Sequence, residues 1–592
     1  MVVEPDNNTQ SKDPHYWEPA IRKRSQSNFS SIPASRIDKA DGVAFRPRPD
    51  LAQNGWADVL CRRLVIPYSG DKRGIVLAST TYAEALRAAD ELGIADRLTG
   101  VKLASASQII PALTRRYGEA LTQQAISGLR DAAPEYSAAT AFPRWMRALW
   151  IAVTALIVMA LIAIPAASAL NMWVLFIPYF TATMALRALL LFNAARPAPA
   201  QTTIRKTTPI VSILVPVYRE AESLPALVKA LKALDYPIRA LDIKILLEED
   251  DTGTIAEAFW LTAGTHIECL IVPPSEPRTK PKAMNFALPF VRGSIVGIFD
   301  AEDAPEADQI SKAVMTLEAG GEDVVCAQAR LSHYNPTDNL MTRCVAIEYA
   351  LWFDMLLAGL SRTDLPVPLG GTSLYFRTAT LRDIGGWDPH NVTEDADLGL
   401  RLARAGKQAR VFDSTTFEEA TGSMAAWIKQ RSRWIKGFML TWAVHMRDPA
   451  RAARELGLLP MVAINIMLLD GFLSFLLQPV ILLSGILALT MDMPPWLGVF
   501  DVRGVALLMI VLFGGQIMLL IGAAIASHRR FGWQVAFAVP LMLPYWMMGG
   551  VAALKALGQI ATKPQFWEKT VHCVSPVAQA RRMAVLTCPK ND

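Results

Sequence analysis

Long apolar stretches constrain the fold of this 592-residue chain more than any other feature of its sequence. Each stretch carries almost no charge and is long enough to cross the hydrocarbon core of a bilayer, which is roughly 30 Å thick. With 52% hydrophobic and 19% charged residues, the chain is too apolar for an ordinary soluble protein. We therefore expect an integral membrane protein, with the lipid bilayer as a partner. The stretches are residues 148–170, 172–194, about 459–490, 503–527 and 532–557.

Basic residues beside the first two stretches indicate their orientation. Arg144 and Arg147 precede the first stretch, further basic residues follow the second, and the connection at residues 170–171 is short and uncharged. Because Lys and Arg are enriched on the cytoplasmic side of membrane spans, we expect a transmembrane hairpin over 147–194 with both ends in the cytoplasm. The hydrophilic block that follows then lies on the cytoplasmic side.

The C-terminal transmembrane region, 457–557, leaves the number of crossings open. The tail, 558–592, is basic and is expected in the cytoplasm, which an odd number of crossings would not allow. In one interpretation the last apolar stretch, which two prolines interrupt, is re-entrant or interfacial. In the other, 459–490 is a hairpin broken at residues 470–471.

Two parts precede the first membrane stretch. Residues 1–50 are rich in Ser, Pro, Arg and Asp without periodicity, so we expect them to be disordered. Residues 51–138 are expected to form a small α/β module, with a strand at 74–80 and helices at 81–93 and 107–121. Through IVLAST and ASQIIPALTRRYG it resembles the N-terminal domain of type II secretion ATPases. It carries no cluster of candidate catalytic residues, and we expect a docking or regulatory role.

The hydrophilic block 207–450 alternates apolar strands with helices. This βαβ order predicts an α/β domain on an open, doubly wound parallel sheet, inserted between the transmembrane segments. In such sheets, ligands bind at the carboxyl ends of the strands. The expected strands are 209–218, 242–251, 294–300 and 323–330, with a helix at 222–234 after the first.

Carboxylates gather at two of these strand ends. EEDD, 248–251, follows the second strand, and Asp300, Glu302 and Asp303 follow the third. Oxygen donors at this spacing suit a hard divalent cation such as Mg²⁺ or Mn²⁺, and no His or Cys lies within either group to favour zinc. We therefore expect a Mg²⁺ or Mn²⁺ cofactor there, with open positions for phosphate oxygens.

These segments resemble a membrane-embedded, processive family 2 glycosyltransferase, of the branch that includes cellulose, hyaluronan and chitin synthases. PVYRE, 216–220, is similar to the family segment that holds uridine, and PKAMN, 281–285, to the segment beside the donor. DAED, 300–303, takes the place of the D-x-D metal motif. The resemblance implies a nucleotide-sugar-binding domain of the glycosyltransferase A type and a UDP-sugar donor. It assigns Tyr218, Glu220, Lys282 and Glu249 or Asp251 to the donor, and Asp300, Glu302 and Asp303 to the metal.

Two further segments resemble the same family. VTEDADLGLRLARAG, 392–406, is similar to its T-E-D segment, whose aspartate is the general base, and here that is Asp395, beside Glu394. QRSRW, 430–434, matches Q-x-x-R-W, the signature of processive members, whose three residues share one face of a helix. That helix, 425–442, is basic and aromatic, so we expect it at the membrane interface. The resemblance assigns Arg433 to the donor, and Gln430, Trp434 and Thr393 to the acceptor.

The C-terminal segment KPQFWEKTVH, 563–572, resembles a stretch common in this branch. We interpret Trp567 and Lys569 within it as a gating loop over the donor.

Together, the resemblance implies inverting, metal-dependent transfer of a sugar from a UDP-sugar to a growing β-linked polysaccharide, of the exopolysaccharide or β-glucan type, which is secreted through the membrane spans. The alternative is non-processive transfer of one sugar to a lipid acceptor. We expect a bacterial-type inner or plasma membrane protein with a cytoplasmic catalytic domain. The net charge of +5 is modest for this length, and we expect no nucleic-acid partner. The sequence identifies no accessory secretion subunit.

Overall fold

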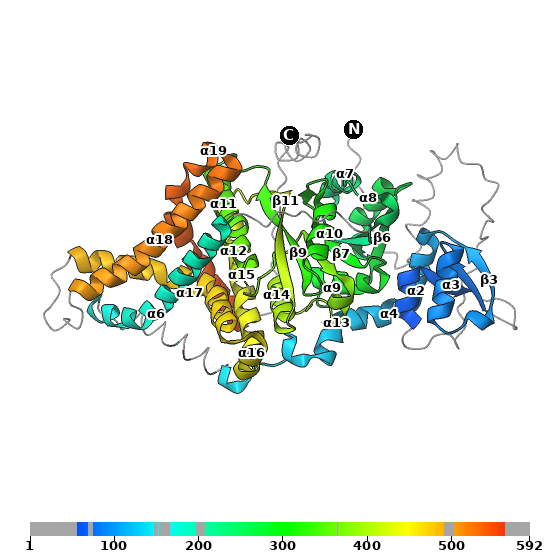
Figure 1. Ribbon diagram of the computed structural model, residues 1–592, viewed down its shortest axis with the longest axis horizontal. Helices are drawn as coiled ribbons and strands as arrows, with labels where there is room; N and C mark the ends of the chain where they lie inside the picture. Colours follow the sequence, from blue (N-terminus) through cyan, green and yellow to red (C-terminus); the bar gives the residue numbers. More distant parts are fainter. Residues whose placement is uncertain are drawn as a thin grey trace, which may run out of the picture.

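The computed structural model describes residues 56–68, 75–146, 166–196, 208–363, 365–490 and 502–562, with a few single positions between 148 and 155. Figure 1 shows three parts along the longest axis: a small N-terminal module, a central domain around a β-sheet, and long helices at the opposite end. The segment 1–50, expected to be disordered, and the expected gating residues Trp567 and Lys569 lie outside the described residues.

The N-terminal module is built on a three-stranded sheet. β2 (Ile75–Ser79) lies at its centre, antiparallel to β1 (Val65–Tyr68) and parallel to β3 (Leu98–Leu103). The predicted helix 107–121 is the first part of a longer one, α4 (Ala106–Ala132). Its later turns continue because they contact the central domain, where Asn285 donates to the carbonyl of Ala125 at 3.2 Å. The module also contains α2 (Trp56–Arg63) and α3 (Tyr82–Glu91).

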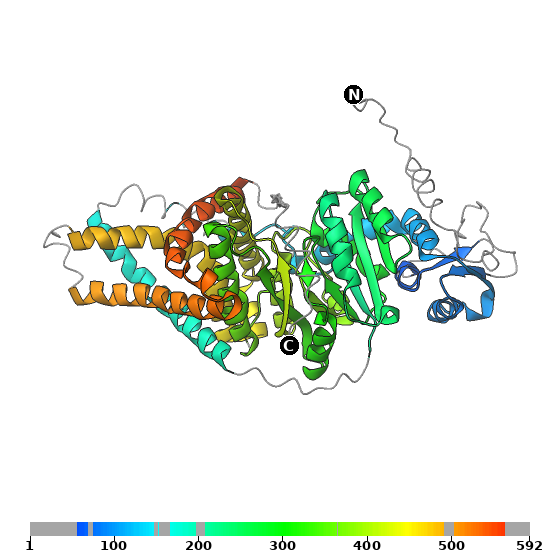
Figure 2. The same cartoon turned by 90° about the horizontal axis from the view of Figure 1, so that it is seen from above.

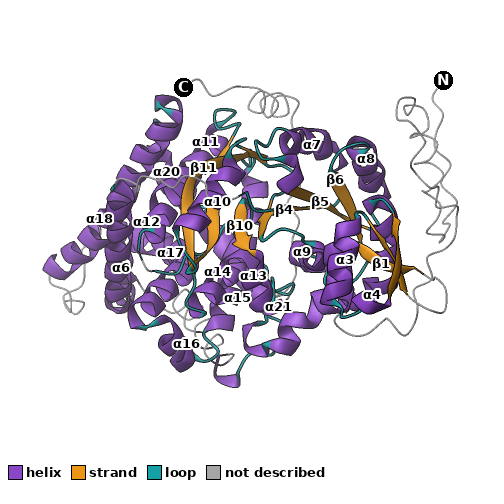
Figure 3. Ribbon diagram, turned by 45° about the vertical axis from the view of Figure 1, so that its right-hand side comes forward, coloured by secondary structure: helices purple, strands orange, loops and turns teal. Residues whose placement is uncertain are grey.

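The central domain contains an eight-stranded mixed sheet in the order β6-β5-β4-β7-β10-β9-β11-β8 (Figure 3). The α/β prediction is confirmed, but the sheet is mixed and not parallel throughout. β6, β5, β4 and β7 are parallel, whereas β10 is antiparallel to both of its neighbours and β8 is antiparallel to β11. The strands are β4 (Val211–Val217), β5 (Leu241–Glu248), β6 (Ile267–Val272), β7 (Ile295–Ile298), β8 (Ala304–Pro305), β9 (Val324–His333), β10 (Leu374–Arg377) and β11 (Gln408–Glu418).

Both faces of the parallel strands are buried, which explains why these strands read as continuous apolar runs. On β4, Ile213 and Val215 pack into one core with residues of α7, α8 and α10, whereas Leu214 packs into the other core with residues of α4 and α9. Alternate side chains of a strand point to opposite faces, so one apolar run supplies both cores. The helices are α7 (Leu224–Lys232), α8 (Thr252–Thr262), α9 (Lys280–Ala287), α10 (Gln309–Ala319), α13 (Thr378–Asp383) and α14 (Glu394–Arg404).

Two expectations about the apolar stretches are wrong. α6 (Ala166–Ala195) runs unbroken through residues 170–171, where the hairpin connection was expected. α17 (Leu458–Thr490) likewise runs unbroken through residues 470–471, which excludes a hairpin broken there. Figure 2 shows these helices projecting from the central domain, and α6 packs against both α17 and α18 (Val502–Phe531).

The last apolar stretch is a chain of short helices, as its two prolines suggest. α19 (Trp533–Ala536) and α20 (Met542–Met547) are followed by α21 (Gly549–Thr562), which packs against α17 and the long helix α15 (Met424–His445). α15 contains the stretch 425–442 that we expected at the membrane interface. It is largely buried, because the central domain covers one side and α17 and α21 cover another.

Four helical segments of the described chain are long and apolar enough to cross a membrane, judged by length and composition. One of them, Leu340–Ser361, lies inside the block that we expected to be wholly cytoplasmic, and most of it is buried. It comprises α11 (Leu340–Tyr349), a π-helical segment (Ala350–Leu356) and α12 (Leu357–Ser361). The other three are Ile177–Ala195, Leu458–Leu477 and Trp533–Ile560.

Close backbone contact joins α6 to α12. A Cβ atom at Gly359 would overlap the carbonyl of Leu190, and Arg362 donates to the carbonyls of Asn193 and Ala194 at 2.8 and 2.7 Å. The last turn of α6 is therefore held by the central domain.

We expect Gly359→Ala to lower the free energy of unfolding by about 1–3 kcal/mol, because backbone atoms of α6 cannot move aside. Gly253→Ala in α8 is the matched control, since a Cβ there meets no atom within 4 Å. It should leave stability within about 1 kcal/mol of the wild type, because alanine is the better helix former. Thermal unfolding in detergent measures both, and equal stability of the two variants would contradict the close contact.

Candidate active site

A cavity of about 520 Å³ opens at the carboxyl ends of β4, β5 and β7. Its wall continues along α14 and α15 and ends among α6, α17 and α18. One continuous space therefore joins the sheet edge to the apolar helices. Most of the residues assigned to a site from the sequence line this cavity: Tyr218, Glu220, Asp300, Glu302, Thr393, Glu394, Asp395, Gln430, Arg433 and Trp434.

The acids after β7 divide into two kinds. Asp300 and Glu302 line the cavity. Asp303 is fully buried and turned inward, where it accepts hydrogen bonds from the backbone N–H of Asp300, at 2.8 Å, and from the hydroxyl of Thr372. Burial and the charge of Asp300 raise the pKa of Asp303 to about 8. Asp303 thus braces the loop that presents Asp300.

The acids after β5 also differ from one another. Arg278 Nη1 donates to the Tyr218 hydroxyl at 2.8 Å and to Asp250 at 2.6 Å. Glu249 is exposed and does not line the cavity. Asp251 caps α8 and accepts from the backbone N–H of Arg219, a residue in the left-handed region at φ 54°. The acid that contacts Tyr218 is therefore Asp250, which the sequence reasoning did not select.

The two lysines of α9 have different roles. Lys282 is fully buried, donates to both carboxylate oxygens of Glu248 at 2.8 Å, and does not line the cavity. Lys280 does line it, pairs with Asp300 and donates to the Gly371 carbonyl at 2.7 Å. Burial opposes its charge, but the neighbouring acids Asp300, Glu394 and Asp303 together outweigh this, and the pKa of Lys280 is raised. The lysine available to a ligand is Lys280, two positions before the residue assigned from the sequence.

The first turn of α14 carries the T-E-D residues into the cavity. Burial raises the pKa of Asp395 to about 6, although the backbone N–H of Ala396 donates to it at 2.7 Å. Burial and the neighbouring Asp395 raise the pKa of Glu394 to about 8. A carboxylate with a pKa close to neutrality is well suited to accept a proton from a hydroxyl.

α15 carries the Q-x-x-R-W residues, which all line the cavity, so the expected common face is present. Gln430 is 9% exposed, and its Oε1 has no hydrogen-bond partner among the described residues. Burial lowers the pKa of Arg433, against the opposing effect of Glu394. The guanidinium of Arg431 lies 4.3 Å from the centre of the Trp434 ring. This wall therefore offers an amide, a cation and an aromatic face.

Two parts of the cavity wall were missed from the sequence. Glu418, at the end of β11, lines the cavity, and burial together with Glu302 raises its pKa well above the usual range. At the far end, Arg187 of α6 pairs with Asp470 of α17, and Ser474 donates to Asp470 at 2.6 Å. The sequence signal for this second group is the charged residue, Arg187 or Asp470, inside an otherwise apolar stretch.

The acids at β7 fit a hard divalent cation of the Mg²⁺ or Mn²⁺ type. Among the described residues, no three His, Cys, Asp or Glu side chains converge as a complete metal cage. Asp300 and Glu302 nonetheless place two carboxylates in the cavity, and Mg²⁺ commonly takes one or two carboxylates, with substrate phosphates and water completing its coordination. The donor set therefore suits a cation that arrives with a phosphate ligand.

Residues 208–437 match the sequence profile of the family described as glycosyltransferase like family 2. The matched range contains the acids of the sheet edge, the T-E-D residues and the Q-x-x-R-W residues. The chain contains a family 2 glycosyltransferase domain. That prediction is confirmed at this level, and the processive subtype stays a prediction.

Several relatives share this glycosyltransferase domain. Beta-monoglucosyldiacylglycerol synthase of Nostoc sp. is 24% identical over 395 residues, which cover 64% of this chain and 80% of that protein. Probable glycosyltransferase YdaM of Bacillus subtilis is 26% identical over 235 residues, 39% of this chain and 56% of that protein. Probable glucomannan 4-beta-mannosyltransferase 1 of Arabidopsis thaliana is 28% identical over 243 residues, 39% of this chain and 43% of that protein. The matches thus span about half the length of the last two relatives.

Among solved structures, mannosyltransferase PcManGT from Pyrobaculum calidifontis, in complex with GDP-Man and Mn²⁺, aligns with a TM-score of 0.43 and 19% identity. The alignment covers 65% of this chain and 97% of that chain.

Replacement of the two lysines of α9 should have different effects, one on donor binding and the other on stability. Lys280→Met removes a cation from the cavity, so we expect the donor KM to rise roughly tenfold or more at nearly unchanged stability. Lys282→Met leaves Glu248 buried without its partner, which costs about 3–5 kcal/mol of folding free energy. Donor titration and thermal unfolding separate the two effects. Weak donor binding by a fully stable Lys282→Met protein would instead support the assignment of Lys282 to the donor.

Proposed function

We propose that the glycosyltransferase domain transfers a sugar from a UDP-sugar, with inversion at the anomeric carbon, to a growing β-linked polysaccharide. The observation that carries the proposal is the single cavity in which the acids of β7, the T-E-D carboxylates and the Q-x-x-R-W residues meet. A donor held at the sheet edge and an acceptor held along α15 would face each other across Asp395.

The donor would lie between the ends of β4 and β7. Tyr218 offers a ring to the base, and Arg278 and Asp250 offer hydrogen-bonding groups beside it. Lys280 and Arg433 are the cations of the cavity that face the carboxylates and would contact the diphosphate. Asp300 and Glu302 would hold Mg²⁺ or Mn²⁺, which supplies positive charge to the departing diphosphate.

Asp395 would act as the general base, with Glu394 beside it. It takes the proton from the acceptor hydroxyl as that oxygen attacks the anomeric carbon from the side opposite the diphosphate. In this role Asp395 would not ligate the metal, because a carboxylate bound to a divalent cation is a poor base. Gln430 and Trp434 would hold the terminal sugar of the acceptor, the indole providing a flat apolar surface for the ring, and Thr393 lies beside them.

The apolar helices support an acceptor that enters or leaves through the membrane. The cavity reaches Arg187, Asp470 and Gln516 on three such helices. Charged side chains inside membrane helices are rare, and by default they are candidates for a functional site such as a substrate path. We propose that the chain is an integral membrane protein of the bacterial inner or plasma membrane, that the catalytic domain is cytoplasmic, and that the product is secreted along these helices.

A lipid acceptor is the second candidate, and one observation favours it. The match to beta-monoglucosyldiacylglycerol synthase covers 64% of this chain, whereas the match to the glucomannan mannosyltransferase covers 39%. The longer match extends beyond the catalytic domain. This supports an acceptor site of the same kind in the two proteins. The hydroxyl of a lipid would then occupy the position proposed for the end of the glycan.

Asp395→Asn should lower the transfer rate by about 10²–10⁴-fold, because an amide cannot accept the acceptor proton. Donor binding should stay near the wild-type value, since the change leaves the acids of β7 intact. Because burial raises the pKa of Asp395 to about 6, the charged base predominates above that pH. The wild-type rate should therefore fall as pH drops through about 6, and this acid limb should be absent from the residual activity of the variant.

Asp383→Asn is the matched control, since Asp383 is exposed on α13 and does not line the cavity. It should retain wild-type transfer over the same pH range. Full activity in Asp395→Asn would exclude this residue as the base.

Membranes that contain the protein, incubated with radiolabelled UDP-sugars and Mg²⁺ or Mn²⁺, test the proposed product. A high-molecular-weight polymer from one donor, lost in Asp395→Asn and after chelation with EDTA, would support processive synthesis. A single labelled sugar in the organic phase would overturn the polysaccharide proposal in favour of the lipid acceptor. Equal incorporation with and without EDTA would contradict the metal assignment.

A further inference from the structure

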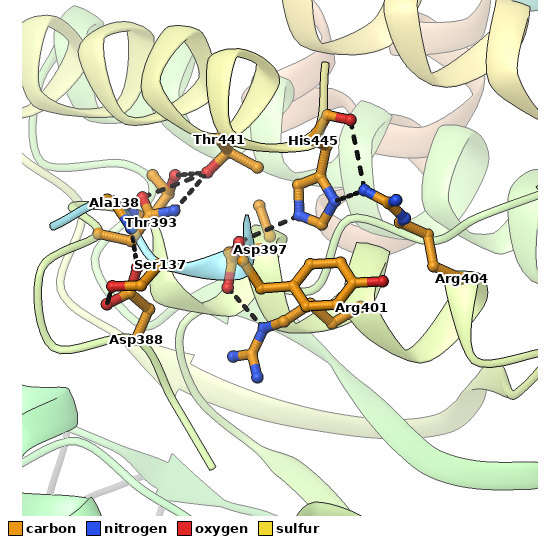
Figure 4. A network of polar contacts seen from close by, with 12 residues as sticks. Ser137, Ala138, Asp388, Thr393, Asp397, Arg401, Arg404, Thr441 and His445 are labelled. Carbon is orange, nitrogen blue, oxygen red and sulfur yellow. Dashed lines mark hydrogen bonds and ion pairs between the residues drawn. The ribbon is translucent and has the colours of Figure 1, made fainter. Parts of the chain in front are cut away.

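A seam of small and polar residues joins α14 to α15. Gly437, Thr441 and His445 recur at every fourth position of α15 and so share one face. A Cβ atom at Gly437 would overlap the side chain of Thr393, and the hydroxyls of Thr441 and Thr393 are 3.1 Å apart. His445 Nε2 lies 3.0 Å from Asp397 Oδ1 (Figure 4). The first turn of α14 is therefore held against α15 at three successive levels.

The Asp397–His445 contact is completely buried and its hydrogen bonds are directional. Both side chains have 0% exposure. Arg401 Nε donates to the other Asp397 oxygen at 2.8 Å, and Arg404 Nη1 lies 3.4 Å from His445 Nδ1. An arginine can only donate, so Nδ1 accepts and the ring proton resides on Nε2, directed at Asp397. Burial lowers the pKa of His445, in keeping with this neutral form.

The partners of this seam are the elements on which the proposed chemistry depends. Asp395 stands two residues before Asp397 in the first turn of α14. Gln430, Arg433 and Trp434 stand earlier on the same helix that ends in His445. A contact between Asp397 and His445 thus fixes the proposed base relative to the acceptor wall. Misplacement of a reacting group by about 1 Å can cost roughly 10²-fold in rate.

We propose that Asp397 and His445 are positioning residues, which hold the T-E-D carboxylate in register with the acceptor-binding face of α15. This inference rests on the proposed function, because it concerns the transfer step at the same cavity. Neither residue lines the cavity, so both act through Asp395 and not on the substrate.

The chain that leaves the N-terminal module covers the outer side of this contact. The Tyr136 ring centre is 6.1 Å from that of His445, and the guanidinium of Arg404 lies 4.8 Å from the Tyr136 ring. The next residues are held by Asp388, which accepts from the backbone N–H of Ala138 at 2.6 Å and from the hydroxyl of Ser137 at 3.3 Å (Figure 4). This cover keeps water from the Asp397–His445 hydrogen bond, which is stronger for being dry.

Steady-state kinetics on the full chain test the proposal. His445→Ala should lower kcat by about 10–100-fold and leave the donor KM within about twofold, since the donor wall is untouched. His445→Gln should recover kcat to within about threefold of the wild type, because an amide N–H can replace the Nε2 proton. Thr441→Val removes a second contact of the seam without changing its shape, and should lower kcat in the same way by a smaller factor. His266→Ala, just before the distant strand β6, is the control and should leave kcat unchanged.

The outcomes separate the two proposals. If the wild type transfers sugar while His445→Ala and Thr441→Val retain its kcat, the positioning role is overturned and the proposed function stands. The positioning role is likewise overturned if glutamine fails to restore the loss, or if KM rises as much as kcat falls. If the wild type transfers no sugar from any UDP-sugar, the proposed function fails and the positioning role fails with it. Thermal unfolding of each variant in detergent confirms that kinetics are compared between folded proteins.

Discussion

Lys280 lies between the carboxylates of β7 and those of α14, and its ammonium offsets the repulsion between them. It pairs with Asp300, and Glu394 also raises its pKa. Without such a cation, the pKa of Asp395 would lie further above its ordinary value, and a neutral acid cannot accept a proton. Under the proposed function, the diphosphate of the donor and a divalent cation bring charges that nearly cancel. They therefore enter a site in which Lys280 already offsets part of the negative charge of the carboxylates.

A second constraint is that one helix, α15, serves three surfaces at once. It presents Gln430, Arg433 and Trp434 to the cavity, His445 to α14, and other faces to α17 and α21. A site built on a regular helix is held more precisely than one built on loops, since neighbouring elements restrain it along its length. The candidate site residues and the apolar helices are consequently parts of one packed structure. Movement of α17 or α21 would therefore shift the part of the cavity wall that carries Gln430, Arg433 and Trp434.

Most of the residues selected from the sequence line one cavity, because strand ends and helix faces follow simple periodicities. Apolar runs ending in acids identified Asp300 and Glu302, and the i, i+3, i+4 spacing identified the face of α15. The same reasoning does not report burial, where the fold distinguishes between near neighbours. Lys280 and Lys282 differ by two positions on a helix, and only its packing on the sheet decides which one is buried. Asp250 was passed over for Glu249 and Asp251 for the same reason.

The sequence also did not show in which direction a strand runs or whether a helix continues without a break. β10 is four residues long, and nothing in LYFR reports that it runs antiparallel to its neighbours. The expected break at residues 170–171 followed from counting apolar residues, whereas α6 continues through these positions. The buried polar seam between α14 and α15 depends on contacts between segments about 50 residues apart, such as Asp397 and His445. No local pattern carries that information.

The ion pair between Arg187 and Asp470 bears on the choice of acceptor. Arg187 stands eight residues before the end of α6, about 12 Å along the helix, so the pair lies within the apolar part of this helix. The acyl chains of a lipid acceptor would face this pair with nothing to hydrogen-bond. A glycan presents hydroxyls along its whole length, and a paired charge offers donors and acceptors to them at little net electrostatic cost. Under the proposed function, the ion pair suits the carbohydrate acceptor, because the hydroxyls of a glycan can hydrogen-bond to two charged side chains that already pair with each other.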